Sequence, residues 1–195
     1  MSMKTPDTPT WTYRAFKAGV MFWLVLGRGE RARDLLDRML QRWPDDAYVL
    51  SSRAHLHAQA GRRDAAIADA QALVHAHPAR SAADWFNLAF LLEAAERLDE
   101  AEPAFRRAVE IDPKLDRAWY GLGLTLIRLG RHDEAVKALE RTTKLQPMSP
   151  YGWYQLARVH MDRQSPDEAR KIILHLKGFE PKVAAQLERE TGLAA

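Results

Sequence analysis

Apolar and small residues recur at helical spacing along the chain, and short breaks separate them into pairs of helices. Residues 116–149 show this clearly, because one helix face with i, i+3, i+4, i+7 spacing consists of Trp119, Leu122, Gly123 and Leu126. Gly130 breaks the pattern, and a second face then continues through Ala135, Leu139 and Thr142 until Pro147. The pattern predicts two antiparallel helices. Neither can bury its second face within the pair, so neighbouring pairs must stack.

The same unit returns about every 34 residues. Trp85, Trp119 and Trp153 are 34 residues apart, and prolines recur at separations of 34 or 35 residues at Pro44, Pro78, Pro113, Pro147 and Pro181. Five units result, namely 13–46, 47–80, 82–115, 116–149 and 150–183, with Ser81 as a single inserted residue. Counted from the first residue of each unit, position 20 is always alanine: Ala32, Ala66, Ala101, Ala135 and Ala169. A period of this length predicts an all-α stack of helix pairs.

The sequence outside the repeats differs at the two ends. We expect residues 1–12, which contain Pro6 and Pro9, to form a flexible N-terminal tail. Residues 13–183 are predicted to form a single domain, and residues 184–195 a C-terminal capping helix and tail. The last segment carries Leu187 among charged residues, and a polar outer face is what the final helix of a stack requires.

The unit resembles the tetratricopeptide repeat (TPR), most closely in the third unit at Trp85, Leu88, Ala89, Leu92, Ala101, Phe105, Ala108 and Pro113. The first two units depart from the family pattern: Phe16 and Leu50 replace the tryptophan, and Gly19 and Arg53 replace the leucine. The resemblance implies a right-handed α-solenoid, a TPR-like superhelix of five antiparallel helix pairs with a C-terminal capping helix.

Composition and motifs argue against catalysis. The chain has no cysteine, which excludes disulfides, thiolate metal sites and cysteine nucleophiles. His55 and His57 stand two residues apart, as do His75 and His77, so on a helix each pair points in divergent directions. Packed histidines explain them better than a metal site. No phosphate-binding loop, nucleophile elbow or convergent carboxylate pair occurs. We predict no catalytic, cofactor or metal site, and a protein that is not an enzyme.

Charge and hydropathy restrict the partners further. The net charge is +3 and the pI about 9.3, but arginines alternate with acidic residues through every unit, as solvated helix faces do. We therefore expect no nucleic-acid partner. The longest apolar run, 18–26, has nine residues, whereas a membrane-spanning helix needs about 20. No signal-peptide cleavage site follows it, so we expect no transmembrane segment and a cytoplasmic location.

The family resemblance implies a concave groove, lined by the first helices of the units, that binds a peptide or helix of a partner. Mapped onto this chain, the groove residues are Lys17, Met21, Tyr48, His55, Phe86, Asn87, Phe90, Arg117, Tyr120, Leu124, Arg128, Tyr151, Tyr154 and Arg158. Aromatic and arginine side chains dominate binding energy at interfaces. Five groove positions are basic, Arg14 among them, and two further groove positions, Glu93 and Asp162, are acidic, so we expect a protein or peptide with apolar or aromatic anchors and a slight acidic excess.

These features predict an adaptor or scaffold. The alternative is a dedicated chaperone or assembly factor that holds one client subunit, near a membrane complex. The first unit suggests a second surface, because Phe22 occupies position 10, which should pack against a preceding repeat. Phe22, Trp23 and Leu26 are candidates for self-association. We expect either that Trp11 and Tyr13 fold back over this apolar face or that a second copy covers it as a homodimer. Membrane contact is the less favoured alternative because the apolar run is short.

Overall fold

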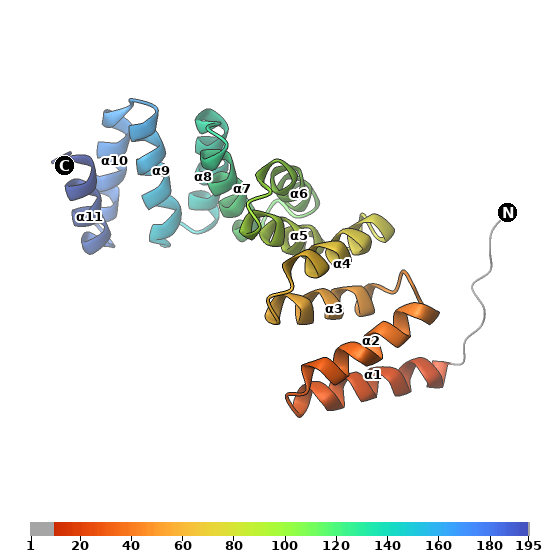
Figure 1. Ribbon diagram of the computed structural model, residues 1–195. Helices are drawn as coiled ribbons and strands as arrows, with labels where there is room; N and C mark the ends of the chain where they lie inside the picture. Colours follow the sequence, from red (N-terminus) through yellow and green to blue (C-terminus); the bar gives the residue numbers. More distant parts are fainter. Residues whose placement is uncertain (1–9, 195) are drawn as a thin grey trace. The chain divides into compact units, whose positions relative to one another are not determined.

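The computed structural model describes residues 10–194, and within this range the regular structure is entirely helical (Figure 1). The helices are α1 (Thr10–Val25), α2 (Gly29–Arg42), α3 (Ala47–Gln59), α4 (Arg63–Ala76), α5 (Ala82–Ala94), α6 (Leu98–Ile111), α7 (Asp116–Arg128), α8 (His132–Leu145), α9 (Pro150–Asp162), α10 (Pro166–Lys177) and α11 (Pro181–Thr191). Five helix pairs and one further helix confirm the predicted fold class.

The two ends differ from the predicted boundaries. Residues 1–9 of the predicted tail lie outside the described residues. Residues 10–12 belong to α1 rather than to a tail, because Tyr13 is packed and bonded, which holds the first turn of the helix. At the other end, α11 begins at Pro181 rather than at residue 184, since proline at the first helical position lacks only an N–H that would have no partner there.

A three-residue turn joins the two helices of every pair, and all five turns have the same backbone conformation. Position 15 is left-handed in each, with φ between 56° and 72°, at Gly27, Gly61, Glu96, Gly130 and Gln164. The next residue donates its backbone N–H to the carbonyl oxygen five residues earlier, at 2.8–2.9 Å. This bond closes the end of the first helix, and the left-handed conformation explains why glycine is the usual residue.

The alanines at position 20 are fully buried in all five repeats. They allow the two helices of a pair to approach closely. Gly123 does the same from the other side, since a Cβ atom there would lie 2.8 Å from Leu139. The period seen in the sequence therefore reflects close contact between helices within each pair.

Two compact units divide the chain, residues 1–80 and 81–195. The boundary falls at Ser81, the single residue inserted between repeats. Ser81 is the N-cap of α5, and its hydroxyl accepts a hydrogen bond from the backbone N–H of Ala83 at 3.1 Å. The assignment of residues 13–183 to one domain stays a prediction.

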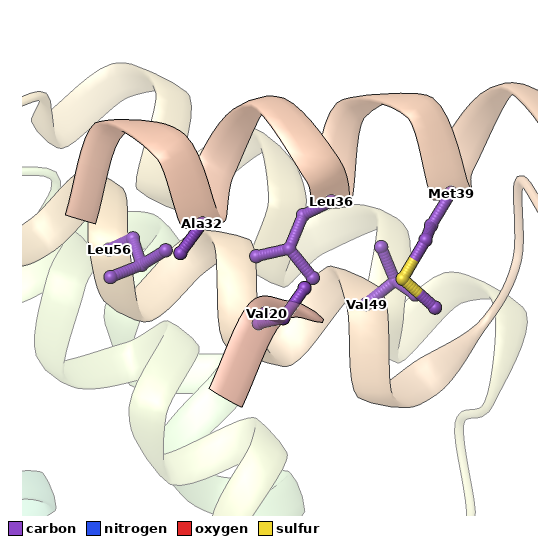
Figure 2. Packing of buried hydrophobic residues seen from close by; sticks show 6 residues of the cluster. All are labelled: Val20, Ala32, Leu36, Met39, Val49 and Leu56. Atoms are coloured by element: carbon purple, nitrogen blue, oxygen red, sulfur yellow. The ribbon is translucent and has the colours of Figure 1, made fainter. Parts of the chain in front are cut away.

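The core of the first unit lies where α2 packs against α1 and α3. Figure 2 shows the six buried side chains that form it: Val20, Ala32, Leu36, Met39, Val49 and Leu56. A hydrogen bond of 3.1 Å from the Tyr13 hydroxyl to Asp46 Oδ1 adds a link between α1 and the start of α3. Asp46 also caps α3 by accepting from the Val49 N–H at 2.9 Å. Burial, followed by the bond to Asp46, raises the pKa of Tyr13 to about 12.

A buried ion pair explains why the second repeat departs from the family pattern. Arg53, which replaces a leucine, donates two hydrogen bonds to Asp69, at 2.8 and 2.5 Å, and a third to Asp37 at 2.7 Å. The Asp69 side chain is only 6% exposed and that of Arg53 is 23% exposed. The bond to Asp69, more than any other contact, raises the pKa of Arg53. Arg53 on α3 and Asp69 on α4 therefore form an ion pair between the two helices of the repeat.

The second unit contains α5–α11, and tryptophan and proline link its successive repeats. Trp119 Nε1 donates to the carbonyl oxygen of Pro113 at 3.0 Å, and Trp153 Nε1 donates to that of Pro147 at 2.9 Å. Each bond joins a first helix to the turn before it. This shared contact explains why both residue types recur with one period. At the end of the unit, α11 packs on α9 and α10 and buries Leu187.

Arginines on the outer faces pair with carboxylates one turn away. Arg97 bonds to Glu100, Arg107 to Glu110 and Arg131 to Glu134, each with i, i+3 spacing. Such exposed pairs contribute little individually, and they account for many of the arginines in the chain. None of the helices within residues 10–194 combines the length and the hydropathy that crossing a bilayer requires.

Candidate functional site

A pocket of about 520 Å³ opens in the second unit between the first helices of its three repeats, and we name it the α5–α7–α9 pocket. Six of the predicted groove residues line it together: Phe86, Phe90, Arg117, Tyr120, Leu124 and Tyr151. They come from three different repeats. Predicted groove residues that lie about one helical turn apart on each first helix, such as Phe86 and Phe90, thus line one shared cavity in the second unit.

Aromatic rings form one wall of this pocket. Phe86 stacks on Phe90 with ring centroids 6.3 Å apart, and the ring of the buried Phe105 lies 6.1 Å from that of Phe86. The guanidinium of Arg117 lies 5.1 Å from the Phe86 centroid, within cation–π distance. Phe90 is 55% exposed and Tyr151 is 71% exposed. The rim therefore presents large apolar side chains to solvent.

Glycine makes room for the floor of the pocket. A Cβ atom on Gly121 would lie 2.5 Å from the Phe105 ring, and one on Gly152 would lie 3.1 Å from Thr142. Without side chains at these positions, the buried residues behind them reach the cavity surface. Lining residues that the sequence prediction missed are Phe105, Asp116, Gly121, Thr142, Gln146, Ser149 and Gly152. Glycine on the inner face of a first helix was the available signal.

A second, smaller pocket of about 220 Å³ lies beside the first. Its lining includes Leu124, Ile127, Arg128 and Arg158. Arg128 pairs with Glu93 at 3.2 Å and also with Glu96, so carboxylates of the chain already engage its charge. This predicted groove residue is consequently less available to a ligand than an unpaired arginine would be.

Further along the unit, Tyr154 and Arg158 line a third pocket of about 480 Å³. The Tyr154 hydroxyl donates to Glu190 Oε2 at 2.7 Å, which ties α9 to α11. This hydrogen bond, followed by burial, raises the pKa of Tyr154, and the same bond lowers the pKa of Glu190. Arg158 lies 5.7 Å from the Tyr154 ring centroid. Tyr154 is therefore held in place by the last helix.

The charges around the α5–α7–α9 pocket are nearly balanced. Two carboxylates, Glu93 and Asp116, and one guanidinium, Arg117, are among its lining residues. Aromatic and aliphatic residues dominate the rest of the lining, with Phe86, Phe90, Phe105, Tyr120, Leu124 and Tyr151 among them. The pocket is therefore suited to an apolar side chain, and it carries no basic excess of its own.

The predicted groove residues of the first unit line none of the three pockets described above. Lys17 Nζ lies 4.0 Å from the centroid of the Tyr48 ring, a cation–π contact. Met21 is 53% exposed, and His55 is exposed. In the second unit, Asn87 is exposed on α5 but does not line any of the three pockets described above.

The three residues predicted for self-association differ in their exposure to solvent. Phe22 is 57% exposed and Leu26 is 53% exposed, whereas Trp23 packs against the core of the first unit, with Arg31 4.5 Å from its ring centroid. The expected fold-back is wrong. Tyr13 packs edge-on against Trp43, and Trp11 is 70% exposed, so neither covers Phe22.

The histidines at position 11 are packed in both repeats that carry one. Arg62 donates to His57 Nδ1 at 3.1 Å, whereas the buried His160 Nδ1 has no hydrogen-bond partner among the described residues. Burial, ahead of other causes, lowers the pKa of both imidazoles. Within residues 10–194, no three histidine, aspartate or glutamate side chains gather as a metal site would need.

Comparisons with known proteins agree with this architecture. Two sequence profiles described as tetratricopeptide repeat match residues 51–116 and 92–154, and together they span more than half of the chain. No curated protein matches the chain in sequence.

Solved structures share the fold at low identity. A crystal structure of MamA protein has a TM-score of 0.80 at 20% identity, covering 93% of this chain and 96% of that one. YrrB, described as a TPR protein with an unusual peptide-binding site, has 0.78 at 17% identity, covering 87% and 88%. MamA 41-end from Desulfovibrio magneticus RS-1 has 0.75 at 17% identity, covering 97% and 100%.

Sequence profiles, helix pairing and solved structures thus lead to one assignment. The recurring turn, the buried alanines and the tryptophan–proline bonds are features of the repeat itself. The chain belongs to the tetratricopeptide repeat family.

Proposed function

We propose that this protein is a non-catalytic adaptor or scaffold whose α5–α7–α9 pocket binds an apolar or aromatic side chain of a partner peptide or helix. One observation carries the proposal. Two large aromatic side chains, Phe90 and Tyr151, stay exposed on the rim of a cavity whose floor is opened by glycine. Exposing such side chains is unfavourable unless a partner covers them.

The size of the cavity supports an anchor side chain with adjoining backbone. Pockets of about 300–1,000 Å³ are typical of ligand sites, and 520 Å³ falls within that range. YrrB, which shares the fold, is a protein with a peptide-binding site of its own. The interaction role also agrees with what tetratricopeptide repeat proteins generally do.

The charge preference of the ligand rests on fewer residues than the apolar preference. Arg128 is paired within the chain, so the proposed slight acidic excess depends on Arg117 and Arg158. We place the acidic groups of the ligand outside the anchor, where they can reach these two guanidinium groups. The anchor itself is apolar or aromatic.

Affinity purification with mass spectrometry from the cells that produce the protein tests the proposal. The bait is compared with a double variant, Phe90→Ala with Tyr120→Ala, and with a control, Leu174→Ala. Leu174 is similarly exposed, at 53%, but lies on α10 and lines none of the pockets described above. We expect the double variant to lose the partner and the control to keep it, at unchanged helicity and melting temperature. Retention of the partner by the double variant would contradict the proposal.

A further inference from the structure

The outward face of α1 carries a continuous stripe of exposed residues that no helix of the first unit covers. The stripe consists of Trp11, Ala15, Ala18, Phe22 and Val25, all exposed, with side chains of 70%, 57% and 81% exposure at Trp11, Phe22 and Val25. Their spacing alternates between four and three residues, the pattern along which two helices pack side by side. At 1.5 Å per residue the stripe is about 21 Å long.

Two of the stripe positions are equivalent to positions that a helix buries in α3 and α9. Position 3 corresponds to Ala15 and position 10 to Phe22. In α3 these positions are Val49 and Leu56, which are 0% and 7% exposed and pack against α2 (Figure 2). In α9, position 3 is Gly152, against Thr142 and Thr143 of α8, and position 10 is the buried Val159. At Ala15 and Phe22, α1 therefore has the form of a helix-packing surface without its helix, and Ala18 and Val25 extend that surface along exposed positions.

From this arrangement we infer that a second copy of the chain covers the stripe, with the two α1 helices packed antiparallel about a two-fold axis. The stripe is complementary to itself between Ala15 and Val25, because two small residues, Ala15 and Ala18, are followed by two larger ones, Phe22 and Val25. With the axis at the level of residue 20, Phe22 of one copy lies opposite Ala18 of the other. Val25 then lies opposite Ala15. Large side chains meet small ones at four levels along the interface, as close packing requires.

The antiparallel arrangement also fits the ends and the charges. Trp11 of one copy comes to the turn after α1 of the other, beside Leu26, which is 53% exposed. Arg14, exposed beside the stripe, lies about 18 Å along the axis from its equivalent, which is beyond the Debye length of about 8 Å at physiological salt. A parallel pair would instead place Phe22 on Phe22 and Arg14 next to Arg14. The self-complementarity of the stripe is thus specific to one orientation.

This surface is separate from the pocket proposed for partner binding, so the two ideas fail independently. Light scattering during size-exclusion chromatography on the full chain should give twice the 22.2 kDa of one chain. Phe22→Glu should raise the dissociation constant of the dimer by at least about thirtyfold, as loss of a central aromatic residue does. Phe90→Glu is the matched control, because Phe90 has nearly the same exposure, at 55%.

Cysteine pairing then tests the orientation, since the chain has no cysteine of its own. A mixture of Ala15→Cys and Val25→Cys chains should oxidise to disulfide-linked dimers that contain one of each, whereas either variant alone should not. Efficient linkage of Ala15→Cys to itself would show a parallel pair and overturn the inference.

Four other outcomes would also overturn it. The first is a wild-type chain that stays monomeric at every concentration. The second is a dimer that survives Phe22→Glu. The third is a dimer that Phe90→Glu abolishes, since that result would place α1 in the pocket of the other copy. The fourth is a monomer that sediments with vesicles of phosphatidylcholine and phosphatidylserine, and loses this binding with Phe22→Glu. That result would assign the stripe to a membrane surface.

Discussion

Replacing Arg53 by leucine would restore the family residue, yet we expect it to destabilise the protein. Asp69 is 6% exposed and receives both of its short hydrogen bonds from Arg53. Removing one partner of a buried ion pair typically costs about 3–5 kcal/mol, because the remaining charge stays buried without compensation. The bond from Arg53 to Asp37 adds little, since Asp37 is 43% exposed.

One neighbour can offset part of this loss. His57 Nε2 lies 3.8 Å from Asp69 Oδ2 and would become its nearest cation once protonated. The destabilisation by Arg53→Leu should therefore be larger at pH 8 than at pH 5.5. Replacing both members of the pair, as Arg53→Leu with Asp69→Leu, removes the buried charge altogether. We expect the double variant to lie within about 1 kcal/mol of wild type or above it.

Urea denaturation followed by circular dichroism measures these effects. With a slope of about 2 kcal/mol per molar urea, the single variant should lower the midpoint by about 2 M. The double variant should recover most of that difference. A single variant that costs less than about 1 kcal/mol, or a double variant no more stable than the single, would refute the argument that the pair is buried and coupled.

Three smaller effects follow from the same structure. Gln164→Gly should stabilise the protein by about 1 kcal/mol and Gly130→Ala should destabilise it by about as much, both measured by urea denaturation, because position 15 has a left-handed backbone. The lowered pKa values of His57 and His160 mean that their contribution to stability is present above pH 6.5 and is lost as the pH falls below it. The urea midpoint should therefore be lower at pH 5 than at pH 8. The double variant His57→Gln with His160→Gln should make this difference between the two pH values smaller. Tyr13→Phe should lower the melting temperature, with a loss of about 1 kcal/mol from one hydrogen bond, and a wild-type melting temperature would contradict that bond.

The helix pairs could be predicted from the sequence because their determinants are local and repeated. The alanine at position 20 is fully buried in every repeat, and the residue at position 15 is left-handed in every turn. A requirement that recurs five times is visible without coordinates. Departures from the pattern were visible too, but not their cause. Arg53 could be understood only when Asp69, on the other helix of the pair, was seen to face it.

The candidate site could be predicted only in part, for a similar reason. Phe86, Phe90 and Tyr120 follow from their positions in the repeat, and all three line the pocket. The residues of the pocket floor could not be predicted, because Phe105 belongs to the core of its repeat and reaches the cavity only where Gly121 lacks a side chain. The ion pairs of Arg128 could not be predicted from the sequence either, since the carboxylates that engage Arg128 come from a different repeat.

The proposed role of the α5–α7–α9 pocket is tested most directly by photo-crosslinking in the cells that produce the protein. p-Benzoylphenylalanine replaces Phe90 at the pocket rim or Leu174 on α10, two positions of similar exposure. Irradiation should join a partner protein to the chain labelled at position 90, and the chain labelled at position 174 should remain uncrosslinked. Equal crosslinking at both positions, or crosslinking at position 174 alone, would contradict a binding role for the pocket.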